Sequence, residues 1–186
     1  MPSKLSSPRW AAWVALAAAL AACRATASEP EDELRAATVL SFLRYSEWPG
    51  APAGDHTLTV GVFGRPSLVA TFRKALEDKT VENRLVRVLE FPAEPSNGCC
   101  QIVFFAGDKP GELKPALAAA RSLHALTIGV SDQFLDLGGA IQLVLVDGHM
   151  SFEVDRDVLD RSGCTISSKL LRYGQVRKGG KARPPA

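Results

Sequence analysis

Cysteine is the residue type with the most varied chemistry in this chain. Three cysteines, Cys99, Cys100 and Cys164, lie in the part expected to fold. An odd number leaves one thiol over, and a bond between the neighbours Cys99 and Cys100 would close a small, strained ring. In an oxidising compartment we therefore expect a disulfide between Cys164 and one of the other two, with buried free thiols as the alternative.

Metal, phosphate and dinucleotide sites are not indicated by the sequence. It has no C-x-x-C pair, and its histidines, His56, His124 and His149, lie far apart without helical spacing. Neither G-x-G-x-x-G nor G-x-x-x-x-G-K-[ST] occurs, and Gly64-Arg65-Pro66 places a proline where a phosphate-binding turn needs backbone N–H groups. We therefore expect no metal and no cofactor.

Nucleophilic and calcium-binding patterns are also missing. No serine lies in G-x-S-x-G, and the two serines before Lys169 are too close to it for the S-x-x-K arrangement of acylating enzymes. Asp155, Asp157 and Asp160 lack the glycine and terminal glutamate of a calcium-binding loop, so we expect them to cap and solvate a helix start. The sequence predicts no catalytic residue, and a hydrolase with a site assembled from distant residues is the last alternative.

The N-terminus has the pattern of an export signal. Lys4 and Arg9 precede an apolar run from Trp10 to Ala22. At 1.5 Å per residue, this run is too short to cross the roughly 30 Å of bilayer hydrocarbon as a stable helix. We therefore expect residues 1–27 to act as a signal peptide that takes the protein to the periplasm.

Two processing patterns follow the apolar run. The sequence Leu-Ala-Ala-Cys ending at Cys23 resembles the lipobox of bacterial lipoproteins, and Ala25-Thr26-Ala27 is a small-x-small cleavage site. We favour lipid attachment at Cys23, because a cysteine at the end of the run is rarer than small residues. Arg24, rather than aspartate, after this cysteine then predicts attachment to the outer membrane. Cleavage after Ala27 is the alternative.

The charge distribution argues against nucleic acid as a partner. The chain has 22 basic and 20 acidic residues, and without Lys4 and Arg9 the two numbers are equal. Residues 177–186 contain four basic residues and no acid, so the part before them carries about four net negative charges. A basic nucleic-acid surface on the folded part is not expected. Residues 177–186 are expected to form a disordered basic tail.

Helix-like and strand-like segments alternate along the chain. Leu34, Leu40 and Leu43 recur at helical spacing, whereas residues 101–106 form a continuous apolar run typical of a buried strand. Helices are expected over residues 31–45, 67–76 with Ser67 as its cap, 111–122, 157–162, and 167–173 with Ser167 as its cap. Strands are expected over residues 58–63, 85–91, 101–106, 125–130, 140–146 and 150–154.

These elements predict one α/β domain over residues 28–176, a three-layer sandwich with a mainly parallel sheet. The strands at 101–106 and 125–130 are apolar along most of their length and need cover on both faces. Asp147-Gly148 predicts a two-residue turn between the last two strands. We therefore expect an antiparallel C-terminal hairpin at the edge of the sheet.

Several segments resemble the YfiR-like family of exported bacterial proteins, from about Arg35 to Gln175. The matching segments are the helix that runs into Glu47-Trp48-Pro49, LTVGVFG at 58–64, CQIVFF at 100–105, LTIGVSDQFLDLGGAI at 126–141, and FEVDRDVLDRSGCTISSKLL at 152–171. Two positions depart from the family pattern. Asp155 replaces the usual asparagine, and Gly61 stands where some relatives carry a cysteine able to pair with the one that matches Cys100.

The resemblance implies a small regulator without catalysis. Such proteins bind the periplasmic sensory domain of an inner-membrane signalling protein and restrain its output, typically cyclic di-GMP synthesis by a diguanylate cyclase. A sensor kinase is the other membrane partner that the resemblance allows. A small-ligand binding module that feeds a sensor kinase is the alternative function, and a homodimer is compatible with either.

Three residues are candidates for the partner interface: Trp48, Ser168 and Lys169. An exposed tryptophan beside a proline would serve as an anchor. A tryptophan that closes an amphipathic helix more often covers the core, and Lys169 is equally explained as a solvated surface residue.

Overall fold

The strand β5 (Ile102–Phe105) lies at the centre of the sheet, and all its residues are buried. The computed structural model describes residues 29–48, 56–92 and 100–177. Successive side chains of a strand point to opposite faces. Ile102 and Phe104 accordingly join one apolar cluster, and Val103 and Phe105 join a second. The sheet therefore has a separate apolar core on each face.

The main sheet has eight strands in the order β10-β8-β7-β6-β5-β2-β4-β3. Strands β4, β2, β5, β6 and β7 are parallel neighbours, whereas β8 is antiparallel to β7, β10 is parallel to β8, and β3 is antiparallel to β4. Their bounds are β2 (Thr57–Phe63), β3 (Thr80–Val81), β4 (Arg84–Glu90), β6 (Leu126–Gly129), β7 (Ile141–Val146), β8 (His149–Asp155) and β10 (Gln175–Arg177). The predicted mainly parallel sheet is confirmed.

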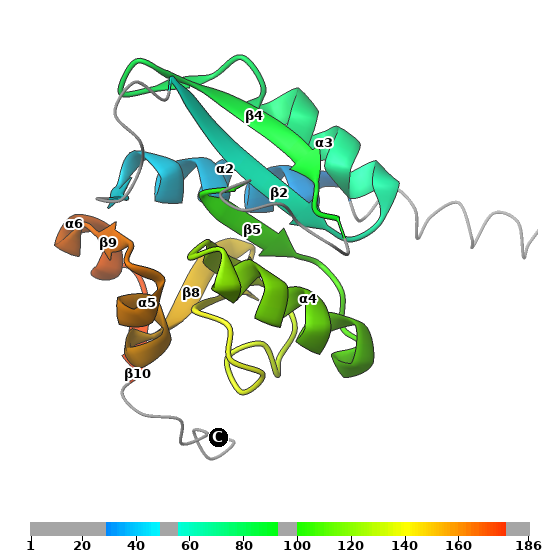
Figure 1. Cartoon of the computed structure of the whole chain (residues 1–186), viewed down its shortest axis with the longest axis vertical. Coiled ribbons are helices and arrows are strands. Elements are labelled where there is room, and N and C mark those ends of the chain that lie inside the picture. Colours follow the sequence, from blue (N-terminus) through cyan, green and yellow to red (C-terminus); the bar gives the residue numbers. More distant parts are fainter. Residues whose placement is uncertain (1–28, 49–55, 93–99, 178–186) are drawn as a thin grey trace, which may run out of the picture.

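Helices cover both faces of this sheet. On one face, α2 (Glu29–Arg44) and α3 (Pro66–Leu76) pack with Ile102 and Phe104, and on the other face α4 (Pro110–Ser122) packs with Val103 and Phe105. Figure 1 shows α4 separated from α2 by the central strands. This arrangement confirms the predicted α/β layers.

The hairpin between β7 and β8 is also confirmed, but its predicted position at the edge of the sheet was wrong, because β10 pairs with β8 on the outer side. The two strands pair antiparallel up to Val146 and His149. Asp147 and Gly148, between them, both have positive φ, at 48° and 77°. Two successive positive φ values are what a tight two-residue hairpin turn requires.

The start of α3 differs from the prediction. The helix begins at Pro66 with Arg65 as its N-cap residue, and no side chain caps it. Proline suits the first helical position, because its φ is already helical and its missing N–H would have no partner there. The helix therefore starts before Ser67, and the prediction that Ser67 is the cap was wrong.

The caps of the last two helices are as predicted. The Val158 N–H donates to Asp155 Oδ1 at 3.0 Å and caps α5 (Arg156–Ser162). The Lys169 N–H donates to Ser167 Oγ at 3.3 Å and caps α6 (Ser168–Leu171). Asp155 thus caps α5 and Asp157 lies in its first turn, whereas Asp160 pairs with Arg156 at 3.0 Å. Helix α6 is shorter than the expected 167–173.

Four short strands were not predicted. They are β1 (Ser46–Glu47), which pairs with β9 (Thr165–Ile166) in a separate two-stranded sheet, and the edge strands β3 and β10.

Arg177, expected in the tail, is the last residue of β10, and its Nη2 lies 3.0 Å from Asp136 Oδ1. Residues 178–186, the signal peptide with Cys23, and Cys99 lie outside the described residues.

The cysteines lie in different cores. Cys164 packs with the α2 and α3 side of the sheet, and Cys100 packs with the α4 side. They are not bonded to each other, so the structure does not contain a Cys100–Cys164 disulfide. The sheet itself separates them, which the count of cysteines could not reveal. Any bond to Cys99 falls outside the described residues.

Gly61 in β2 faces Cys100. A Cβ at Gly61 would lie 3.0 Å from Cys100 Sγ and 3.0 Å from a ring carbon of Phe91. This separation is about what a disulfide imposes between the Cβ of one cysteine and the sulfur of the other. The glycine therefore stands where a single substitution could link β2 to Cys100, two residues before β5.

We predict that Gly61→Cys forms a disulfide with Cys100 under oxidising conditions, after a small shift of the Phe91 ring. The variant should show fewer titratable thiols than the parent protein when unfolded. Its free energy of unfolding should rise on oxidation, by at most about 4 kcal/mol for a loop of this length. Gly61→Ser is the matched control, since it adds similar bulk without a bond. Peptide mapping that finds the introduced cysteine unbonded, or bonded to Cys99, would contradict the prediction.

Candidate partner interface

The two-stranded β1–β9 sheet joins the end of α2 to the C-terminal part of the chain. Ser46 pairs with Ile166 and Glu47 with Thr165. The Ser167 N–H donates to the Tyr45 carbonyl at 2.8 Å, which continues the pairing by one step. Segments far apart in the sequence thus lie side by side, as Figure 1 shows for α6 and β9 beside the end of α2.

The outer side of this junction is a patch of exposed side chains, which we call the terminal surface. It consists of Arg44, Tyr45, Ser168, Lys169, Arg172 and Tyr173, all of them exposed. Tyr45 is 46% exposed and Tyr173 is 76% exposed, and they are the two tyrosines of the chain. Tyrosine and arginine side chains are enriched at protein interfaces and among the residues that contribute most to binding. The terminal surface is therefore suited to contact another protein.

The sequence-predicted interface residues fall on different sides of the junction. Ser168 and Lys169 belong to the terminal surface, whereas Trp48 is partly buried and packs against the core. Its indole N–H is buried without a hydrogen-bond partner among the described residues. Trp48 lines a hollow of about 310 Å³ together with Leu58 and Arg84. It covers the core beside the junction and does not offer an open contact.

The Cys164 thiol lies beneath the same junction. Burial raises the pKa of Cys164 to about 12, and a hydrogen bond with the Ser46 side chain opposes this shift only in part. A thiol with such a pKa is almost entirely protonated at neutral pH, and the thiolate is the reactive form. Cys164 is therefore a packing residue, unsuited to nucleophilic chemistry.

Neither a metal cluster nor a membrane-spanning helix occurs in the described part of the chain. Within residues 29–48, 56–92 and 100–177, no three His, Cys, Asp or Glu side chains come close enough together to hold a metal ion. Among the helices of these ranges, none combines the length and apolar character needed to cross a membrane.

The position where open α/β sheets usually bind ligands is occupied by charged side chains. It lies outside the carboxyl ends of β2 and β5, where the strand order reverses. A hollow of about 320 Å³ there is lined by Arg65 and Lys109 among others. Arg65 pairs with the buried Asp32 of α2, and Lys109 Nζ lies 3.3 Å from Glu112 Oε1. Both cations thus pair with acidic side chains of the protein, and we do not assign a ligand to this hollow.

Sequence reasoning missed the two tyrosines. Tyr45 was expected to end an amphipathic helix, and Tyr173 was expected inside a longer C-terminal helix. Because α2 ends at Arg44 and α6 at Leu171, both tyrosines lie just past a helix end and are exposed. The periodicity of the sequence does not mark these ends.

Comparison with known proteins places the whole domain in one family. No protein with a curated description matches the chain. A family model described as YfiR/HmsC-like matches residues 32–175, from the first turn of α2 to the first residue of β10. This range includes the buried strands, the β1–β9 junction and the terminal surface. The chain belongs to the YfiR/HmsC-like family.

Proposed function

We propose that the protein is a periplasmic, non-catalytic regulator that binds the sensory domain of an inner-membrane diguanylate cyclase and lowers cyclic di-GMP output. The observation that carries this proposal is the family match over residues 32–175. Membership supports a regulatory role in the periplasm. The choice of a cyclase rather than a sensor kinase as the partner belongs to the proposal.

The proposed action requires a preference for one state of the partner. A bound protein shifts an equilibrium only by the difference in its affinity for the two states. The regulator would therefore bind the inactive arrangement of the sensory domain more tightly than the active one. Such a preference requires a surface that is complementary to the inactive state, and it requires no catalytic step.

The terminal surface is the part of the molecule that we assign to this contact. Its two tyrosines provide aromatic contact area, and Arg44, Lys169 and Arg172 add positive charge. The part of the chain before Arg177 is acidic overall, so the terminal surface is a basic patch on an acidic protein. An acidic patch on the sensory domain would orient the complex.

Deletion and binding test the proposal. Deleting the gene should raise cyclic di-GMP in cells, because the partner loses the ligand that favours its inactive state. The purified domain should bind the periplasmic domain of the partner, chosen as a membrane cyclase encoded beside it, at roughly micromolar concentration. Unchanged cyclic di-GMP on deletion, together with no binding in this range, would refute the proposal.

Substitutions on the terminal surface should weaken that binding. We expect Tyr173→Ala and Lys169→Glu each to raise the Kd about tenfold, the loss typical of a residue near the centre of an interface. Leu85→Ala and Lys114→Glu are the matched controls, because both residues are exposed and lie on β4 and α4, away from the terminal surface. Thermal melts should show that all four variants fold. Equal losses in variants and controls would remove the terminal surface from the proposal.

Lipid attachment at Cys23 is proposed on the sequence alone. Mass spectrometry of the mature protein should find a diacylglyceryl group on Cys23. Cys23→Ala should move the protein from the outer-membrane fraction to the soluble periplasmic fraction. Arg24→Asp is a second test, because it keeps the lipid and should alter sorting between the two membranes. An unmodified N-terminus at Ser28 would show cleavage after Ala27 instead.

A further inference from the structure

A pocket of about 430 Å³ lies between α4 and α5. It is lined by Ala118, Arg121, Ser122, Ala125, Thr127, Ala140, Val158, Arg161 and Ser162. Its volume is within the range of about 300–1,000 Å³ found for small-molecule sites. Neither the YfiR/HmsC-like assignment nor the proposed function uses this pocket.

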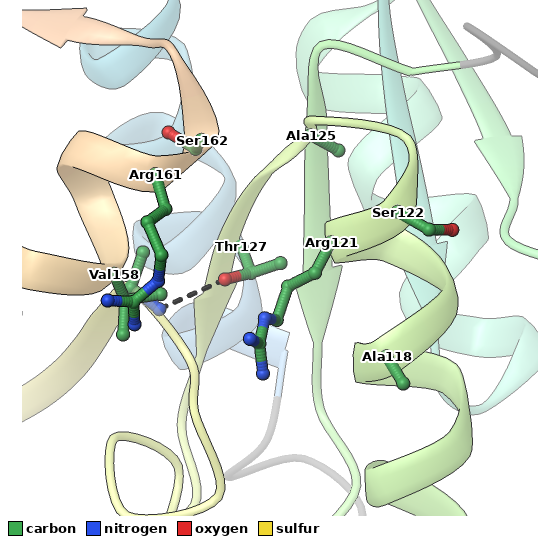
Figure 2. Close-up of a pocket in the computed structure, with 9 residues that line it drawn as sticks. Ala118, Arg121, Ser122, Ala125, Thr127, Val158, Arg161 and Ser162 are labelled. Atoms are coloured by element: carbon green, nitrogen blue, oxygen red, sulfur yellow. Dashed lines mark hydrogen bonds between the residues drawn. The ribbon is translucent and has the colours of Figure 1, made fainter.

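The charge in the pocket is entirely positive. Arg121 comes from the last turn of α4, and Arg161 comes from the last turn of α5. No acidic side chain lines the pocket, and neither arginine forms an ion pair among the described residues. Figure 2 shows the two side chains on either side of Thr127, Arg121 from α4 and Arg161 from α5. Two guanidinium groups thus flank one opening.

The base of the pocket offers a further donor. Thr127 is only 1% exposed, and its Oγ1 accepts a hydrogen bond from the Ala140 N–H at 3.0 Å. This bond uses a lone pair and leaves the hydroxyl hydrogen to donate. The two serines differ, because Ser122 Oγ donates to the Ala119 carbonyl and Ser162 Oγ to the Leu159 carbonyl. The side-chain donors available to a ligand are therefore Arg121, Arg161 and Thr127.

The Arg121 side chain reaches over the turn before β7. Gly138 has φ of +96°, and a Cβ there would lie 2.8 Å from Arg121 Nη1. The guanidinium therefore lies directly over this glycine, in space that any other residue would fill. The absence of a side chain at residue 138 therefore leaves room for Arg121 beside the pocket.

The helix dipole alone does not account for this arrangement. A basic residue in the last turn of a helix is favourable by itself, because the C-terminal carbonyls carry partial negative charge. That effect would be satisfied by side chains pointing into solvent anywhere around the helix end. It does not explain why arginines from two helices flank one pocket whose apolar lining is formed by Ala118, Ala125, Ala140 and Val158.

We propose that this pocket binds a small organic anion, with its carboxylate or phosphate held by Arg121, Arg161 and Thr127 and its apolar body against the alanine and valine side chains. Guanidinium groups bind both oxyanions through paired N–H donors. The apolar wall distinguishes an organic anion from an inorganic one. A ligand here would bridge α4, α5 and the starts of β6 and β7.

The test is direct titration of the purified domain, and it needs no partner protein. Benzoate and phenyl phosphate are the probes, benzamide is the uncharged control, and inorganic phosphate tests the contribution of the apolar body. We expect benzoate or phenyl phosphate to bind in calorimetry and to shift the NMR signals of the Thr127 and Ala140 amides. Benzamide should not bind, and inorganic phosphate should bind more weakly than phenyl phosphate. The better of the two organic probes identifies the headgroup.

Substitutions assign the binding to this pocket. Arg121→Gln and Arg161→Gln should each raise the Kd roughly tenfold or more, and Thr127→Val should raise it less. Lys114→Gln is the matched control, because it removes the same charge from an exposed position on α4 outside the pocket. The proposal fails if neither organic probe binds at about 10 mM. It also fails if both arginine variants behave like Lys114→Gln, or if inorganic phosphate binds as tightly as phenyl phosphate.

Discussion

Burial of β5 on both faces is the constraint on which the rest of the structure depends. A strand with four consecutive buried residues cannot lie at an edge or face water on either side. It must have strand neighbours, here β2 and β6, and a helical layer on each face. Phe104 stacks against Phe72 of α3 at 4.7 Å between ring centroids, and the ring centroid of Phe105 lies 5.6 Å from that of Phe134 on the other face. The two cores follow from this single strand.

Small residues allow the second core to close. Phe134 lies over Gly129 and Gly139, where an added Cβ would come within 2.4 Å and 2.2 Å of its ring. The turn that carries Phe134 can therefore press against the sheet and complete the cover that α4 begins. The same turn contains Gly138, over which Arg121 lies. One segment of backbone thus contacts both the second core and a side chain of the pocket.

The sequence predicted well those elements that bury continuous or periodic apolar surface. The strands at 101–106 and 125–130 and the hairpin at Asp147-Gly148 carried their own signals, and so did the cap at Asp155. The sequence did not predict the elements that form only by pairing with residues far away in the chain. The two-residue strands β1 and β9 have no pattern of their own, because each forms only by pairing with the other. The charged pocket could not be predicted for the same reason. Arg121 and Arg161 are far apart in the sequence and line one pocket only in the folded protein.

The pocket and the terminal surface are connected by a short stretch of chain, and this limits how one could affect the other. From Arg161 the backbone passes through Ser162, whose Oγ accepts the Cys164 N–H at 3.3 Å, and then enters β9 and α6. A ligand that holds α5 against α4 would restrict this stretch. It would change partner binding only if the partner selects one arrangement of α5, since coupling between two sites is reciprocal. An anion that binds equally well to the free and the complexed regulator would occupy the pocket without regulating anything.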